Sequence, residues 1–135
     1  RAEREAARAR EYRGDYRIFA SDIDPEAVAL ARQNAERAGV AQYIEFSVAD
    51  ALAFRRKTDG GVIVTNPPYG ERLLEREEAG RLYERFGEAW RGTENWQLYL
   101  LSGHPEFEQH FGQKAARRRK LYNGPIICCL YSYGR

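Results

Sequence analysis

The feature that most constrains the fold of this chain is the regular alternation of strand patterns with helix patterns along its length. The strand patterns cover 16–21, 43–48, 61–65 and 96–101. The helix patterns cover 24–38, 77–91 and 105–111. Two further strand patterns, 120–122 and 126–133, flank Asn123-Gly124, a dipeptide typical of a tight hairpin. This order predicts an α/β fold with an open, mostly parallel sheet and an antiparallel hairpin at the C-terminal edge.

Three details of these patterns carry specific expectations. Asp24 is expected to cap the first of these helices, Pro25 to open it and Gly39 to end it. Pro125 directly follows the Asn-Gly dipeptide, which argues against a plain two-residue turn. The short apolar run 61–65 is typical of a central parallel strand.

The length and the charge of the chain exclude several classes of protein. A chain of 135 residues has room for one domain with its own core. Its 22 basic and 20 acidic residues give a net charge of +2, so the whole molecule is not a uniformly basic nucleic-acid binder. We find no apolar run near the ~20 residues that span a bilayer and no signal peptide, so we expect no membrane partner.

The cysteines and histidines predict no metal site. Cys128 and Cys129 are adjacent, and neighbouring side chains on a strand face opposite ways, so they make a poor metal pair and a poor disulfide. His104 and His110 are the only imidazoles, and they are expected to be surface or capping residues. Two reduced thiols in a core strand fit a cytoplasmic protein.

The beginning of the chain suggests that it is part of a longer protein. There is no methionine, and residues 1–10 already follow a helical pattern. We therefore expect 1–135 to be one part of a larger catalytic domain.

The motif Asn66-Pro67-Pro68-Tyr69 directly follows the apolar strand pattern. Ligands of open α/β sheets bind beyond the carboxyl ends of the strands. The prolines have no N–H groups and stiff φ angles, so the nearby carbonyls and the Asn66 amide form a preset cluster of acceptors for a planar amino group. Tyr69 offers a face on which a base can stack. The alternative is a rigid turn without chemistry.

Acidic residues also stand at the ends of the two preceding strand patterns. Asp22 could bind a ribose, Ile23 could lie against an adenine, and Asp50 could accept a hydrogen bond from an adenine amino group. The alternative is that Asp22 and Asp24 both serve only the start of the helix. The constellation of Asp22, Asp50 and Asn66 at three successive strand ends is more specific than any one of them.

These segments resemble a known enzyme family. The matching segments are Ser21-Asp22-Ile23-Asp24-Pro25, Ala31-Arg32-Gln33-Asn34-Ala35, Asn66-Pro67-Pro68-Tyr69-Gly70-Glu71-Arg72-Leu73 and Lys120-Leu121-Tyr122-Asn123-Gly124. Together they are similar to the THUMP-containing, class I S-adenosylmethionine-dependent methyltransferases that modify guanine N2 in large-subunit ribosomal RNA. The resemblance covers nearly the whole chain and implies a Rossmann-like sheet.

The resemblance also implies roles for individual residues. Asp22 would hold the cofactor ribose, Ile23 and Ala51 would line the cofactor site, and Asp50 would hold the adenine amine. The Asn66 amide and the Pro67 carbonyl would bind the target amine, Pro68 would complete the rigid turn, and Tyr69 would stack on the base. The implied partner is 23S ribosomal RNA, and the implied reaction is direct methyl transfer, which needs positioning more than a strong base.

The resemblance further implies what this chain lacks. The family's first strand, its glycine-rich cofactor loop and its THUMP domain would precede residue 1. That first strand normally lies between the strand that ends at Asp22 and the strand that ends at Thr65. We therefore expect uncovered strand edges at this place, to be filled by upstream residues, by a partner chain or not at all.

Two alternative functions stay open. The Asn-Pro-Pro-Tyr motif alone also occurs in adenine-N6 and protein glutamine-N5 methyltransferases. An isolated piece could instead be a catalytically inactive module that binds RNA.

A basic segment near the C-terminus could contact RNA phosphates. It contains Lys114, Arg117, Arg118, Arg119 and Lys120. The alternative is a solvated loop that leads into an edge strand, where charges discourage aggregation.

Overall fold

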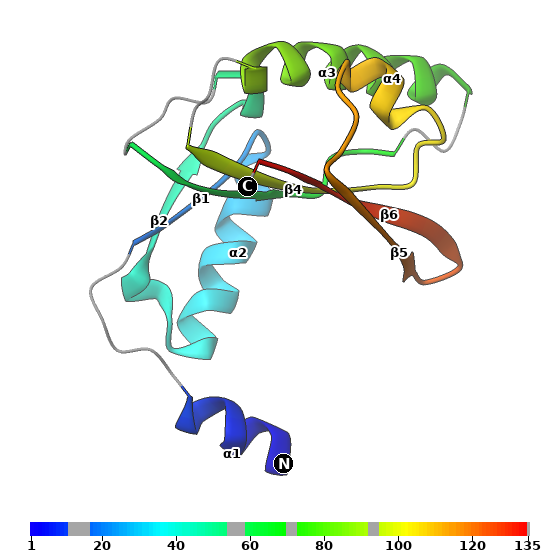
Figure 1. Cartoon of the computed structure of the whole chain (residues 1–135). Helices are drawn as coiled ribbons and strands as arrows, with labels where there is room; N and C mark the ends of the chain where they lie inside the picture. Colours follow the sequence, from blue (N-terminus) through cyan, green and yellow to red (C-terminus); the bar gives the residue numbers. More distant parts are fainter. Residues whose placement is uncertain (11–16, 54–58, 70–72, 92–94, 135) are drawn as a thin grey trace. The chain divides into compact units, whose positions relative to one another are not determined.

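The computed structural model describes residues 1–10, 17–53, 59–69, 73–91 and 95–134. The chain divides into two compact units, unit 1 (Arg1–Ala51) and unit 2 (Leu52–Arg135), and Figure 1 shows the elements of both. The short 3-10 helix η2 (Ala51–Ala53) lies at the division. Each unit is described by itself.

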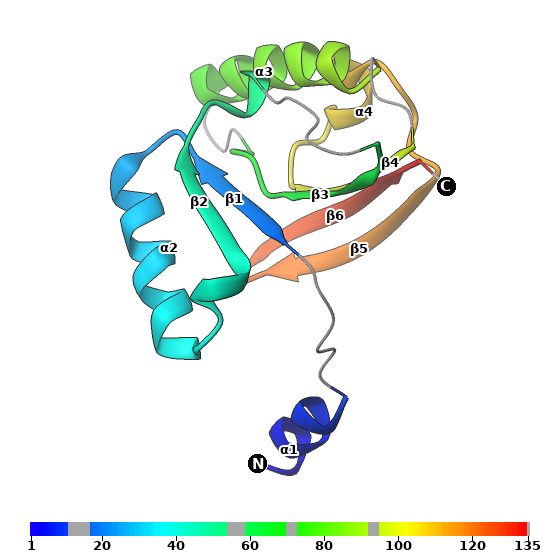
Figure 2. The ribbon, with the colours of Figure 1, turned by 90° about the vertical axis from the view of Figure 1, so that its left-hand side faces the viewer.

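Unit 1 is built on two parallel strands joined by a helix. Strand β1 (Ile18–Asp22) pairs in parallel with β2 (Ile44–Val48), and α2 (Pro25–Ala38) connects them and lies along the pair (Figure 2). The 3-10 helix η1 (Ala41–Tyr43) delays β2 by one residue relative to the expected strand. An exposed helix, α1 (Ala2–Ala9), precedes them.

The ends of α2 form as the sequence predicts. The Asp24 carboxylate accepts a hydrogen bond from the N–H of Glu26, Pro25 occupies the first turn, and Gly39 ends the helix at a φ of 74°. Val28 and Ala35 are the buried residues of this helix.

Unit 2 is a four-stranded mixed sheet with two helices on one face (Figure 1). Strand β3 (Gly61–Thr65) is followed by α3 (Leu73–Arg91), β4 (Trp96–Ser102), α4 (Phe107–Phe111), β5 (Arg117–Asn123) and β6 (Ile126–Tyr133). The order across the sheet is β3-β4-β6-β5, with β3 parallel to β4 and the other neighbours antiparallel. The predicted α/β class and the antiparallel C-terminal hairpin are confirmed.

A largely aromatic cluster between this sheet and the helices forms the core of unit 2. Phe107 stacks on Tyr131 with ring centroids 4.5 Å apart, and Tyr83 meets Phe107 edge-on at 4.9 Å. The cluster consists of Ala79, Tyr83, Trp90, Leu98, Leu100, Phe107, Phe111, Tyr131 and Tyr133.

Three element boundaries in unit 2 differ from the sequence prediction. Helix α3 begins four residues early, because the Leu-Leu-Glu-Arg sequence of 73–76 consists of good helix formers. Helix α4 begins two residues late, because the ring Nδ1 of His104 accepts the N–H of Glu106 and organises a turn first. Strand β5 begins at Arg117, because Arg117 pairs with Ser132 and the antiparallel pairing continues to Asn123 and Ile126. The arginine run therefore lies in a strand.

The hairpin turn also differs by one position. Asn123 pairs with Ile126, so the turn is a plain two-residue one with Gly124 and Pro125 at its centre. Gly124 has a φ of 61°, as the first central residue of a type II′ turn requires, and Pro125 follows at a position that tolerates its fixed φ. The expectation that Pro125 argues against a plain two-residue turn is therefore wrong.

Strand β3 is an edge strand of the sheet that the structure describes, although its composition is typical of a central strand. It pairs with β4, and the side chains of Val62 and Val64 are 57% and 78% exposed. Within unit 1, Ile18 and Phe19 of β1 are about half exposed. The exposure of these side chains shows uncovered faces, while the strand orders leave β1 and β3 with one neighbour each among the described residues, as the expected open edges require.

Candidate functional site

The Asn-Pro-Pro-Tyr motif lies where the sequence places it, directly beyond the carboxyl end of β3. Asn66 and Pro68 are exposed, and Pro67 and Tyr69 are half-buried. Because the Asn66 side-chain amide is exposed at the end of a strand, a ligand can replace the water molecules that hydrogen-bond to it. The motif therefore has the accessibility that a binding site needs.

A buried tyrosine of α3 forms a hydrogen bond with the backbone of the motif. Tyr83, which is 1% exposed, donates a hydrogen bond from its hydroxyl to the Pro68 carbonyl at 2.5 Å. Burial raises the pKa of Tyr83, so the hydroxyl keeps the proton that it donates. Sequence patterns do not single out Tyr83, because nothing in the helical spacing of 77–91 shows where its hydroxyl points.

The hairpin holds the motif from a second side. The Asn123 side-chain amide donates to the Tyr69 hydroxyl at 3.3 Å, and it links residues 54 positions apart in the sequence. A Cβ at Gly103 would lie 3.2 Å from both Tyr69 Cδ2 and Ile126 Cγ2, so the ring of Tyr69 lies close to the backbone at the end of β4. Burial raises the pKa of Tyr69. Sequence analysis treats Asn123 as a turn residue and misses this contact.

The expected cofactor residues lie together at one end of the parallel pair in unit 1. Asp22 ends β1, and its carbonyl accepts a hydrogen bond from the N–H of Ala49 at 3.0 Å, which joins the two strand ends. Asp50 and Ala51 follow two and three residues after β2, and both are exposed. The side chain of Ile23 is 69% exposed. The predicted grouping thus exists within unit 1, whereas the motif belongs to unit 2.

Asp22 and Asp24 have different local contacts. Asp24 is the helix cap, as predicted, and Asp22 accepts the N–H of Asp24 at 2.9 Å through Oδ1. The alternative in which both carboxylates support the start of α2 therefore describes part of what they do. A role of Asp22 in binding a ribose stays a prediction.

The basic segment divides into residues with different partners. Arg118 forms an ion pair with Glu108 at 3.0 Å, and the other oxygen of Glu108 accepts the N–H of Ala115. Arg117 and Arg119 alternate with Arg118 along the exposed edge strand β5, so their side chains lie on the opposite face of the sheet. The remaining cations are Lys114, which precedes this strand, and Lys120, which shares the face of Arg118.

Neither the thiols nor the imidazoles form a metal site in the described part of the chain. Cys128 is buried and Cys129 half-buried, and both are free thiols. His104 is 2% exposed, which corrects the expectation of a surface position, although it does cap the turn before α4. Among the residues that the structure describes, no helix is both long and apolar enough to cross a membrane.

Comparison with known proteins finds relatives that are named as RNA methyltransferases. The chain is 42% identical over 116 residues to YpsC of Bacillus subtilis, a protein named as an RNA methyltransferase, and 38% identical over 122 residues to the ribosomal RNA large subunit methyltransferase K/L of Shewanella baltica. These matches cover 86% and 90% of this chain but 30% and 17% of the relatives, so the chain spans about a third or less of their length.

Solved structures give the same result for the fold. The structure of SMU.472, described as a methyltransferase in complex with SAH, superimposes with a TM-score of 0.87 at 35% identity. That match covers 98% of this chain and 35% of the other. A family model described as the RMKL-like methyltransferase domain matches residues 1–132. Since that match spans nearly the whole sequence, the chain belongs to the family of RMKL-like methyltransferase domains.

Proposed function

We propose that residues 1–135 are the C-terminal part of the catalytic domain of an S-adenosylmethionine-dependent methyltransferase that acts on the N2 amine of guanine in 23S ribosomal RNA in the cytoplasm. One observation carries the proposal: the exposed Asn66 amide lies at the end of β3, on a proline loop that Tyr83 and Asn123 hold from two sides. The names of the relatives support an RNA substrate.

The residues at the strand ends of unit 1 fit the cofactor by their chemistry. A ribose has two hydroxyl donors for a carboxylate such as Asp22, and an adenine has an apolar face for the exposed Ile23 and Ala51. Its amino group can donate to Asp50. When bound, S-adenosylmethionine supplies an electrophilic methyl group. The glycine-rich loop, the first strand and a THUMP domain are proposed to come from residues that precede this chain.

The motif would bind and aim the target amine. An exocyclic amine has two hydrogens, which the Asn66 side-chain oxygen and the Pro67 carbonyl can accept. With both hydrogens held, the nitrogen lone pair is left to attack an electrophilic carbon. The cofactor would supply that carbon as its methyl group and would leave as the thioether, and the methylated nitrogen would give up its extra proton to bulk water as the product leaves the site. Positioning and exclusion of water therefore do most of the work.

Mutation of Asn66 tests this role in the full-length protein. Asn66→Ala should lower the rate of methyl transfer about 100-fold or more, because the amine loses one of its two acceptors, while the cofactor dissociation constant changes little. The rate can be measured in single-turnover assays on transcribed 23S ribosomal RNA, and cofactor binding by calorimetry. A loss of cofactor affinity with an unchanged rate would contradict the assigned role.

The choice of substrate separates the proposal from its alternatives. Radiolabelled methyl groups from the same reaction should appear as N2-methylguanine after nuclease digestion. Label in N6-methyladenine, or in a glutamine side chain of a protein, would favour the other families that share the motif. RNA binding without methyl transfer by residues 1–135 on their own would favour the alternative in which the isolated piece is a catalytically inactive RNA-binding module.

The cations of β5 are proposed to contact RNA phosphates unequally. Arg117 and Arg119 lie on the face opposite to Arg118, whose charge is already matched by Glu108. Arg119→Gln should therefore lower the slope of RNA affinity against salt by about 0.7, the value of one phosphate contact to a single strand. Arg118→Gln is the matched control and should leave the slope nearly unchanged. Equal slopes for the two variants would contradict the assignment.

A further inference from the structure

The Pro68 carbonyl is the end of a directed chain of buried hydrogen bonds. The phenol of Tyr83 has one proton and donates it to Pro68, so in its 2.9 Å contact with Ser102 the serine hydroxyl must be the donor. The Ser102 oxygen in turn accepts the backbone N–H of His104 at 3.0 Å. Each hydroxyl thus accepts one bond and donates the next, an arrangement in which neighbouring bonds strengthen each other.

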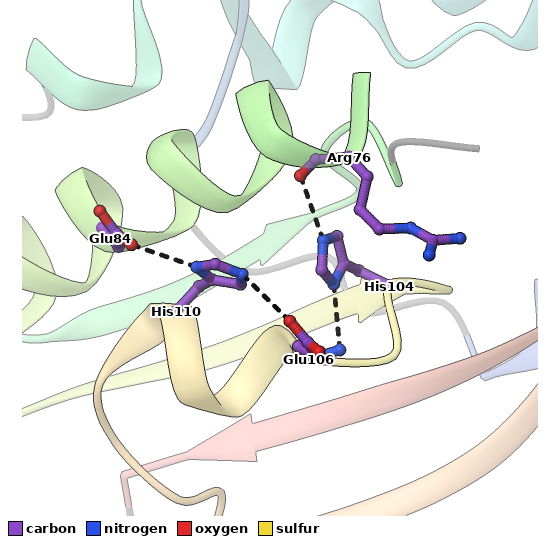
Figure 3. A network of polar contacts seen from close by, with 5 residues as sticks. All are labelled: Arg76, Glu84, His104, Glu106 and His110. Carbon is purple, nitrogen blue, oxygen red and sulfur yellow. Dashed lines mark hydrogen bonds and ion pairs between the residues drawn. The ribbon is translucent and has the colours of Figure 1, made fainter. Parts of the chain in front are cut away.

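The far end of this chain is anchored by the His104 ring. The N–H of Glu106 donates to Nδ1 at 3.0 Å, so this nitrogen is unprotonated and Nε2 carries the proton. Nε2 then donates to the Arg76 carbonyl of α3 at 3.2 Å, and Figure 3 shows the ring between these two partners. Burial lowers the pKa of His104, which favours this neutral ring. Both nitrogens are therefore used to fix the backbone of residue 104.

The motif depends on this chain because it has few donors of its own. Pro67 and Pro68 have no N–H, so the loop is held through carbonyls and side chains. Tyr83 engages the carbonyl of Pro68 and none of the described residues bonds to that of Pro67. The two neighbouring carbonyls are thereby given different tasks, one structural and one available for a ligand.

We propose that Tyr83, oriented by Ser102, is a positioning residue that fixes the Pro68 peptide and so sets the spacing of the Asn66 and Pro67 oxygens for the target amine. The inference rests on the proposed function, because it concerns the geometry of the same acceptors. Without the Tyr83 hydroxyl the loop can turn its Pro68 carbonyl outward. An amine that is misplaced by a fraction of an ångström then meets the methyl carbon at a poorer angle.

The test compares two buried tyrosines of the same core in the full-length protein. Tyr83→Phe removes the hydroxyl and keeps the ring. Tyr133→Phe is the matched control, because Tyr133 is 3% exposed and its hydroxyl donates at 2.8 Å to the Gln113 carbonyl, in the loop that follows α4. The measurements are the single-turnover rate on transcribed 23S ribosomal RNA, the dissociation constants of RNA and cofactor, and the melting temperature.

Tyr83→Phe should lower the rate roughly tenfold or more, with both dissociation constants within about twofold of the parent protein. Tyr133→Phe should lower the melting temperature by a similar amount and leave the rate unchanged. If both variants lose rate in proportion to their stability, or if Tyr83→Phe keeps the parent rate, the positioning role is wrong.

Two further variants keep the result unambiguous. If Tyr83→Phe fails to fold, Ser102→Ala takes its place, since it removes the donor that orients Tyr83. A loss of rate larger than that of Tyr133→Phe supports the proposal. A rate equal to that of the parent protein overturns it. Asn66→Ala separates this inference from the proposed function. If Asn66→Ala is inactive and Tyr83→Phe is fully active, only the positioning role fails, whereas an active Asn66→Ala protein contradicts the proposed function itself.

Discussion

The two units of this chain hold their functional residues in different ways. In unit 2 the motif follows a sheet whose helix face is covered by nine buried side chains among the described residues, and one of these, Tyr83, contacts the motif directly. In unit 1 only Val28 and Ala35 are buried among the described residues, while Ile18, Phe19, Leu30 and Val48 are about half exposed. Unit 2 therefore carries the support of its site within itself. Unit 1 presents Asp22 and Asp50 on a pair of strands with little core.

Removal of one core side chain from each unit tests this difference between the two cores most directly. Phe107→Ala should lower the free energy of unfolding by about 3–5 kcal/mol, because its ring is fully buried among aromatic neighbours. Val28→Ala should cost about 1–2 kcal/mol, since it removes two methyl groups from a nearly buried position. Urea denaturation of the full-length protein measures both. A larger loss for Val28→Ala would show that unit 1 has a stronger core than its exposed residues indicate.

A second prediction separates stability from cofactor binding within unit 1. Asp24→Ala should cost about 1 kcal/mol of unfolding free energy, because it removes the cap of α2, and should leave the cofactor dissociation constant nearly unchanged. Asp22→Ala should instead weaken cofactor binding by roughly tenfold or more, because the ribose loses a charged acceptor. Thermal unfolding measures the loss of stability, and calorimetry measures the cofactor dissociation constant. If Asp22→Ala changes only stability, Asp22 serves the turn and not the cofactor.

A third and smaller effect concerns acid, and it is confined to unit 2 because both histidines of the chain lie there. Burial lowers the pKa of His104 below its ordinary 6.5, against the hydrogen bond to the Arg76 carbonyl and the Glu106 carboxylate, which raise it, and with the charges of His110 and Arg76, which lower it further. The unfolded chain therefore binds a proton at a higher pH than the folded chain does. Stability rises with pH through the window below about 6.5 and is lost as the pH falls through it.

Urea titrations between about pH 5 and pH 7.5 measure this dependence. His104→Asn keeps an acceptor for the Glu106 N–H and removes the titrating ring, so its stability should change less with pH than that of the parent protein. A parent-like dependence in the variant would assign the effect to groups other than His104.

The parts of the structure that the sequence predicts are those with local causes. Asp24, Pro25 and Gly39 act within one helix, and the position of the motif follows from the apolar run before it. The contacts of Tyr83 with Pro68 and of Asn123 with Tyr69 join residues 15 and 54 positions apart, and no spacing rule reports where a hydroxyl or an amide will point after packing. The strand position of Arg117 likewise depends on pairing with β6, which highly charged side chains do not suggest.

Substitution of Gly103 would move the aromatic ring of Tyr69 without removing any of its atoms. A methyl group at this position would stand 3.2 Å from Tyr69 Cδ2, tighter than ordinary contact, so the ring would have to tilt by a few tenths of an ångström. Gly103→Ala would thus change the orientation of the Tyr69 ring by a small amount. Tyr69→Phe and Tyr69→Ala instead remove the hydroxyl or the whole ring. In the proposed role of Tyr69, the absence of a side chain at residue 103 would therefore set the angle at which the ring meets the target base.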